Sequence, residues 1–130
     1  MNKEEHIAYW IKSAEEDWIT VHSLFAGKRY LHSLFFCHLT LEKILKALWV
    51  KNNENNIPPK IHNLVKLHDD AKINLSEDIV IQLYELNAFQ LEGRYPDYLF
   101  EISKRCNNEF TNEIIQKTGQ IRECLLNKLQ

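Results

Sequence analysis

The pattern that most constrains this chain is an apolar stripe near its N-terminus. Between Lys3 and Ala26, apolar residues recur at alternating steps of four and three, at Ile7, Ile11, Ala14, Trp18, Val21 and Phe25. This spacing places them all on one face of an α-helix, so the segment must bury that face against another element. We expect Gly27 to end the helix in the left-handed conformation.

A second helix is predicted from Tyr30 to Asn52. Its apolar stripe comprises Leu31, Leu34, Phe35, His38, Leu41, Leu45, Leu48 and Trp49. Because few residues separate this segment from the first, the two helices are expected to pack as an antiparallel pair. The run NNENNIPPK follows, and its poor helix formers and two prolines predict a surface loop.

The rest of the chain also has helical spacing, without sustained strand alternation. A short helix is predicted within IHNLVKLHDDAK, and a fourth opens at Ser76, which can cap it. That helix must end before EGRYPD, because Gly93 and Pro96 terminate helices. Thr111 is expected to cap a last helix with an inward face of Ile114, Thr118, Ile121, Leu125 and Leu129. The predicted fold is an all-α bundle of five helices in a single domain, residues 1–130.

Composition narrows the functional classes. A formal net charge of -2 gives no overall field that recruits nucleic acid. Cys37, Cys106 and Cys124 lack C-x-x-C spacing, so reduced thiols are expected rather than disulfides. The six histidines form no ligand motif, and we expect neither a metal nor a cofactor. No run of about 18 apolar residues predicts a membrane span, and the acidic start MNKEEHIAYW lacks secretory features, so a cytoplasmic location is expected.

Three ionisable residues interrupt the apolar segment FFCHLTLEKILKALW. His38, Glu42 and Lys46 fall four apart, so Glu42 can contact both of the others on one helix face. We call these three residues the ladder. Three interpretations are open: a solvated row at the edge of the stripe, a buried structural network with a partner from another helix, or a binding or catalytic site.

Two other groups are candidates for chemistry. The segment GRYPDY places Arg94 at a helix break among tyrosines, which suits the recognition of phosphate or bases. A structural role is also open, in which Asp97 neutralises Arg94 and the tyrosines pack over the loop. His62, at the start of the third predicted helix, could cap that helix or complete a polar pocket with the ladder.

The order of these segments resembles the HEPN family of small helical domains. The resemblance rests on an AEEDW helix, the segment YLHSLFFCHLTLEKILKALWV, then HNLVKL after a proline-containing loop, and finally RYPDY. It covers nearly the whole chain. It implies an up-and-down bundle that is frequently dimeric and often encoded beside a minimal nucleotidyltransferase, as a two-component or toxin-antitoxin system.

Many HEPN proteins are metal-independent ribonucleases, and the resemblance implies where their catalytic motif would stand. That motif is an arginine followed after four to six residues by a histidine. Arg94 lies at the corresponding helix break, but Leu99, Phe100 and Glu101 occupy the positions of the expected histidine. Leu99 and Phe100 cannot move protons during RNA cleavage, a task that suits the pKa of histidine. No catalytic residue is therefore assigned.

The favoured hypothesis is a non-catalytic HEPN protein. It would be a homodimeric binding or partner module of a nucleotidyltransferase or toxin-antitoxin system, with a nucleotide-like ligand. Its candidate binding residues are His38, Glu42, Lys46, His62, Arg94 and Tyr95. Arg94 and Lys46 would hold phosphate, and Tyr95 would stack. Glu42 would orient Lys46 and His38. The alternatives are a metal-independent ribonuclease toxin with a rearranged site, acting on RNA, and a purely structural interaction module.

Overall fold

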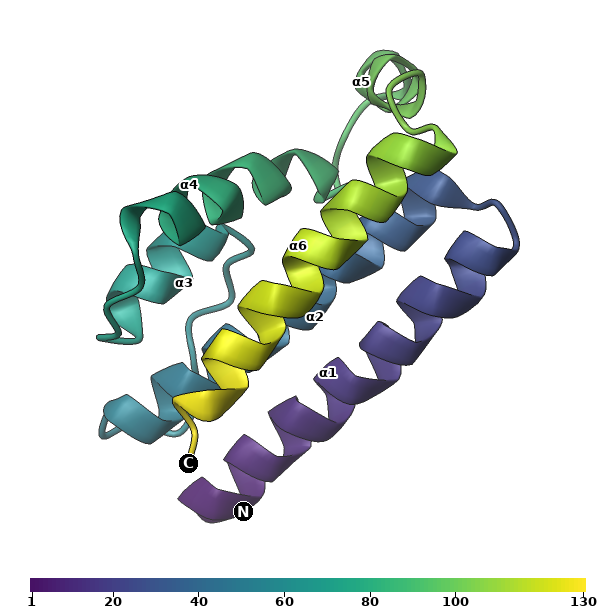
Figure 1. Cartoon of the computed structure of the whole chain (residues 1–130). Helices are drawn as coiled ribbons and strands as arrows, with labels where there is room; N and C mark the ends of the chain where they lie inside the picture. Colours follow the sequence, from purple (N-terminus) through teal and green to yellow (C-terminus); the bar gives the residue numbers. More distant parts are fainter.

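The computed structural model describes residues 1–130 and contains helices without strands (Figure 1). The long helices are α1 (Lys3–Ala26), α2 (Tyr30–Asn52) and α6 (Asn108–Asn127). The shorter elements are α3 (Leu64–Asp70), α4 (Glu77–Leu86), the 3-10 turn η1 (Asn87–Phe89) and α5 (Pro96–Ser103). The all-α class is confirmed, but the chain has six α-helices instead of the five predicted.

Helix α2 forms the centre of the molecule. It packs against α1, α3, α5, α6 and η1, and most of its residues from Ser33 to Val50 are buried. Figure 1 shows α1, α2 and α6 running side by side, with α3 and α4 against one flank and α5 at one end. The core leucines of α2 are fully buried, and each contributes about 2 kcal/mol to folding. They are Leu34, Leu41, Leu45 and Leu48.

The predicted limits of α1 and α2 are confirmed, but the turn between them differs from the expectation. Gly27 keeps a near-helical backbone with φ -83°, and Lys28 takes the left-handed conformation with φ 59°. The chain therefore reverses one residue later than expected. A bond of 2.8 Å from the Arg29 N–H to the Leu24 carbonyl closes the turn.

Long-range side-chain contacts fix the loop after α2. Lys3 Nζ donates to the carbonyls of Val50, at 2.5 Å, and Asn53, at 2.7 Å, which satisfies the C-terminal end of α2. Asn52 Nδ2 donates to the Ala71 carbonyl at 2.9 Å, just after α3. The start of the asparagine-rich loop is thus tied to α1 and to the end of α3, and the loop then leads to His62 and α3.

Helix α5 is the element that the sequence did not predict. The fourth helix ends at Leu86, before EGRYPD as expected, and Tyr95 is extended ahead of Pro96. Pro96 then occupies the first position of a new helix, where its missing N–H costs nothing and its fixed φ suits the helix. The same proline that ends one helix therefore begins the next.

The start of α6 also differs from its prediction. Asn107 is the N-cap, and its side chain accepts a hydrogen bond of 2.8 Å from the Phe110 N–H. Thr111, the expected cap, is fully buried inside the helix, and its hydroxyl has no hydrogen-bond partner. Asparagine is at least as good an N-cap as threonine, and it comes first along the chain.

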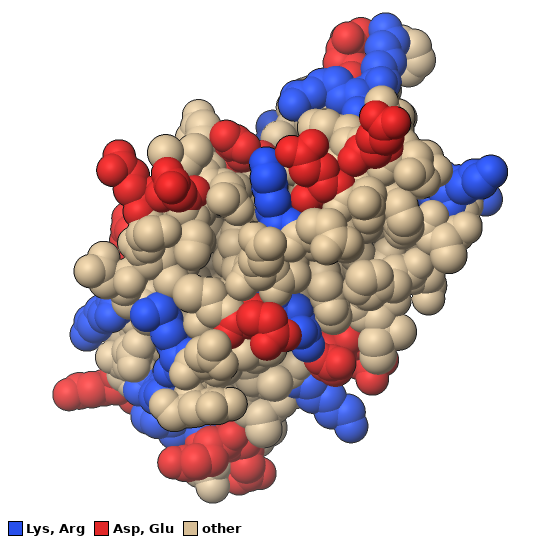
Figure 2. Space-filling view, viewed as in Figure 1, with Lys and Arg blue, Asp and Glu red and all other residues tan.

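Charged side chains of both signs are interspersed over the face shown in Figure 2, and neither sign covers the bundle. This distribution agrees with the near-zero net charge of -2. None of the helices combines the length and the apolar character that crossing a bilayer requires.

Candidate functional site

The ladder residues on α2 are buried. The exposed fractions are 0% for His38, 4% for Glu42 and 7% for Lys46. The interpretation as a solvated row is therefore wrong. Because an unpaired buried charge is costly, the partners of these groups decide what the ladder does.

Glu42 lies at the centre of this group, and its carboxylate accepts hydrogen bonds from two side chains. Its Oε2 lies 3.0 Å from Lys46 Nζ, and its Oε1 lies 2.9 Å from Nδ1 of His62. A carboxylate only accepts, so we assign the hydrogen to Nδ1 of His62. His62 is thus the partner from outside α2 that a buried network requires, and the sequence named it as a candidate for this role.

His38 is the most enclosed member of the ladder. Its Nδ1 lies 3.7 Å from Glu42 Oε1, and neither ring nitrogen has a hydrogen-bond partner. Burial lowers the pKa of His38 from its ordinary 6.5 to about 4, because desolvation of the imidazolium outweighs the attraction of Glu42. The ring is therefore neutral near pH 7 and closed to solvent.

His62 links the ladder to the turn that precedes α5. Its side chain is 46% exposed, and Nε2 lies 3.7 Å from Oε2 of Glu92. The imidazole thus stands between the carboxylates of Glu42 and Glu92. At the other end of the ladder, Lys46 Nζ lies 5.4 Å from the ring centroid of Trp10, within cation-π range. The network connects α1, α2 and two loops.

Arg94 and Tyr95 lie apart from this network, with no hydrogen bond or ion pair to it. Arg94 Nε donates to the Gln90 carbonyl at 3.1 Å, and its guanidinium carbon lies 4.3 Å from the ring centroid of Tyr98. Tyr95 is 82% exposed. Asp97 makes no ion pair with Arg94, in contrast to the structural alternative. Four of the six candidate residues therefore assemble, and two do not.

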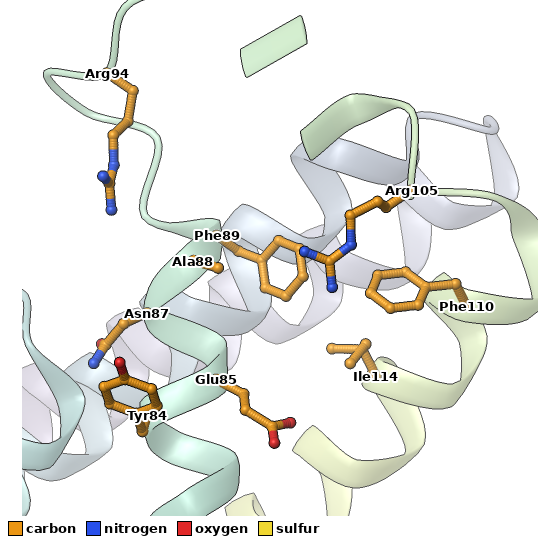
Figure 3. Close-up of a pocket in the computed structure, with 9 residues that line it drawn as sticks. All are labelled: Tyr84, Glu85, Asn87, Ala88, Phe89, Arg94, Arg105, Phe110 and Ile114. Atoms are coloured by element: carbon orange, nitrogen blue, oxygen red, sulfur yellow. The ribbon is translucent and has the colours of Figure 1, made fainter. Parts of the chain in front are cut away.

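Arg94 instead opens onto a cavity of about 440 Å³ between α4, η1 and the start of α6 (Figure 3). A second arginine, Arg105, enters this cavity from the loop after α5. Its guanidinium carbon lies 5.5 Å from the ring centroid of Phe110. The other lining residues are Tyr84, Glu85, Asn87, Ala88, Phe89 and Ile114.

Sequence reasoning missed Arg105 and Phe110, because neither belongs to a motif. A local signal was present in their positions around Asn107. Arg105 lies two residues before this N-cap and Phe110 three residues after it, so the helix start brings the two side chains together. Because the sequence analysis expected Thr111 as the N-cap, it did not predict that the helix start brings Arg105 and Phe110 together.

Other chemical groups give no further site. No cluster of three or more His, Cys, Asp or Glu side chains could hold a metal ion. Cys37 is fully buried, and burial raises the pKa of its thiol to about 12, so it remains protonated at neutral pH. Burial also raises the pKa of Cys106, against the opposing charge of Arg105.

A family model described as HEPN domain matches residues 7–129 of the chain. The chain belongs to the HEPN family. No curated protein and no solved structure matches it. The HEPN family includes nucleotidyltransferase-associated proteins and ribonuclease toxins, and its domains often dimerise.

The motif position expected from the resemblance carries no histidine in this HEPN domain. Leu99, which stands there with Phe100, is half-buried, and Phe100 is 64% exposed. No histidine lines the cavity onto which Arg94 opens. The site therefore offers positive charge and aromatic surface, and its one carboxylate is that of Glu85.

Proposed function

We propose that this HEPN protein is a non-catalytic, dimeric binding module that acts with a nucleotidyltransferase in a system of the toxin-antitoxin type. A phosphate-bearing, nucleotide-like ligand would bind at Arg94. The main support is the cavity at Arg94, which holds unpaired guanidinium groups but no histidine.

Proton transfer is the step that this site lacks. Cleavage of RNA without a metal requires a base at the 2′-hydroxyl and an acid at the leaving oxygen. The two histidines among the candidate binding residues are engaged elsewhere. His62 contacts Glu42, and His38 is closed to solvent. Arginine stays protonated at neutral pH and serves as an anion binder.

One observation favours a second function, a metal-independent ribonuclease with a rearranged site. Glu85 lines the same cavity as Arg94 and Arg105. A carboxylate base and a guanidinium that stabilises negative charge, lining one cavity, are a pair suited to RNA cleavage. Glu85 would then replace the missing histidine.

An RNA cleavage assay in EDTA separates these functions. The parent protein, Arg94→Ala and Glu85→Gln are incubated with unlabelled cellular RNA and with a short labelled RNA, and we expect no cleavage by any of them. Arg29→Ala, which alters an exposed arginine at the start of α2, is the matched control. Cleavage by the parent and by Arg29→Ala, but not by the two site variants, overturns the non-catalytic proposal.

The partner role has its own test. Light scattering after gel filtration should give twice the chain mass of 15.5 kDa, and a monomer at high concentration would contradict the dimer.

Coexpression with a nucleotidyltransferase encoded in the adjacent reading frame should yield a stable complex. If such a neighbour exists and the two proteins elute separately, the partner role is wrong.

A further inference from the structure

The first half of α1 and the chain just beyond α6 enclose a hollow at the end of the bundle that carries both termini. Helices α1 and α6 run side by side, but each packs mainly on α2 and has few direct contacts with the other (Figure 1). The hollow has a volume of about 690 Å³, and we call it the groove. It lies away from the cavity at Arg94, and the proposed function does not use it. The residues of its floor are Ile7, Ala8, Ile11 and Leu129.

The floor of the groove belongs to the part of the apolar stripe of α1 that the core does not cover. Ile11 and Leu129 are half-buried and pack partly on the core. Ile7 is half-buried without belonging to the core, and Ala8 is exposed. Further along the same stripe, Val21 is fully buried. The floor can therefore still bury apolar area against a partner, at about 25 cal/mol for each Å².

The rim of the groove is mainly acidic. Glu4, Glu15 and Glu16 line it, together with one cation, Lys12. Arg122 of α6 pairs with Glu15 at 2.6 Å, so Glu4 and Glu16 keep carboxylates without an ion pair. These two residues are twelve positions apart in α1, which corresponds to about 18 Å along the helix. Unpaired carboxylates at the rim repel nucleic acid and anionic lipid, and they attract cationic side chains.

We propose that the groove docks an amphipathic helix of a partner protein, with apolar side chains on Ile7 and Ile11 and lysine or arginine near both ends. Helices that bind in grooves use apolar anchors three and four residues apart. A helix of about 14 residues is roughly 21 Å long and so reaches from Glu4 to Glu16. A second copy of this chain suits the groove less well. Stable subunit interfaces bury about 800 Å² on each partner, and the floor consists of four side chains.

A synthetic peptide tests the docking of a basic helix. The probe is a fluorescently labelled, amidated peptide of about 14 residues, with leucines on one helical face and lysines near both ends. Fluorescence anisotropy should give a dissociation constant below about 100 μM. One control peptide has glutamate in place of each lysine, and another has the same composition with leucines that no longer share a face. Each control should bind at least about tenfold more weakly.

Substitutions in the rim and in the floor locate the peptide on the protein. Glu4→Gln and Glu16→Gln should each weaken binding by about two- to fivefold, and Lys12→Gln should strengthen it by about twofold, because each removes one exposed charge. Ala8→Gln should weaken binding at least about tenfold, because a longer polar side chain obstructs the floor. Ala8 is exposed, so this variant keeps the fold. Glu101→Gln, on α5 at the far end of the bundle, is the matched control and should bind like the parent.

Four results would overturn the proposal. They are no binding of the basic peptide at millimolar concentration, equal affinity for the glutamate peptide, unchanged affinity in Ala8→Gln, or an equal loss in Glu101→Gln. Circular dichroism checks that each variant is folded.

Two further measurements identify a different occupant. Light scattering should give the same mass for Ala8→Gln as for the parent, and conversion of a parent dimer into a monomer would assign the groove to a second copy instead. The protein should not cosediment with vesicles of phosphatidylcholine and phosphatidylserine. Cosedimentation that Ala8→Gln abolishes would assign the groove to a membrane surface.

Discussion

Glu42 is the residue on which the buried polar network depends, because both Lys46 and His62 direct their donors to its carboxylate. The ladder was predicted from the spacing along α2, since contacts between residues four apart follow from helix geometry alone. The 2.9 Å contact with His62 depends on where the loop before α3 places that side chain. No local rule fixes that position. The sequence therefore did not decide whether His62 caps the third helix or completes a polar pocket with the ladder.

The substitution Glu42→Gln should destabilise the protein by roughly 3 kcal/mol, because it leaves the Lys46 ammonium buried without its partner. Urea unfolding followed by circular dichroism measures the change. Glu16→Gln, on an exposed part of α1, is the control and should stay within about 0.5 kcal/mol of the parent. Equal midpoints for the two variants would show that the network does not stabilise the fold.

His38 makes stability depend on pH. Its pKa in the folded chain is about 4, against its ordinary 6.5 in the unfolded chain, so the unfolded state takes up the proton first as the pH falls. The contribution of neutral His38 is complete above pH 6.5 and is lost progressively down to pH 4, by about 3 kcal/mol. Urea unfolding at several pH values measures this loss.

The variant His38→Leu isolates this effect from other titrating groups. It keeps an apolar side chain in the buried position but cannot take up a proton. Its unfolding free energy should therefore fall less than that of the parent between pH 6.5 and 4. Parallel pH profiles for the two proteins would refute the assignment to His38.

At the scale of elements, the helices with long apolar stripes were the predictable ones. The limits of α1 and α2 follow from their stripes and from the short link between them. Helix α5 has only eight residues and begins at a proline, and a proline in this position predicts the end of the preceding helix more directly than the start of a new one. The predicted start of α6 was wrong for a similar reason. Both Asn107 and Thr111 are residue types that cap helices well, and the spacing of the apolar residues does not distinguish them.

A pair of substitutions checks the start of α6. Asn107→Ala should cost about 1 kcal/mol of stability, because the Phe110 N–H loses its acceptor. Thr111→Val should be neutral or slightly stabilising, because the buried Thr111 hydroxyl has no partner to lose. Thermal or urea unfolding measures both. The reverse order of effects would restore Thr111 as the cap.

At the scale of the whole molecule, one helix organises the core. The all-α class was predictable because the apolar residues of every long segment recur at helical spacing. The cavity was not predictable from the sequence. Its walls come from α4, η1, a loop and α6, and no rule of residue spacing relates these four segments. Cys37 lies within α2 at the centre of this arrangement and is fully buried.

The reactivity of Cys37 should therefore report unfolding of the whole molecule. In a Cys106→Ser, Cys124→Ser background, modification of Cys37 by a disulfide reagent should be at least about a thousandfold slower than for a free thiol. It should accelerate at the urea concentration where helicity is lost. Rapid modification of the folded protein, with helicity intact, would show that α2 opens locally.

The two chain ends lie together at one end of the bundle, and the cavity with Arg94 and Arg105 lies toward the other (Figure 1). A fluorescent protein or an affinity tag can therefore be fused to either terminus without covering the cavity. The short distance between the ends also suits insertion of this domain into a surface loop of another protein. In such a fusion the cavity would lie at the end of the domain opposite to the junction.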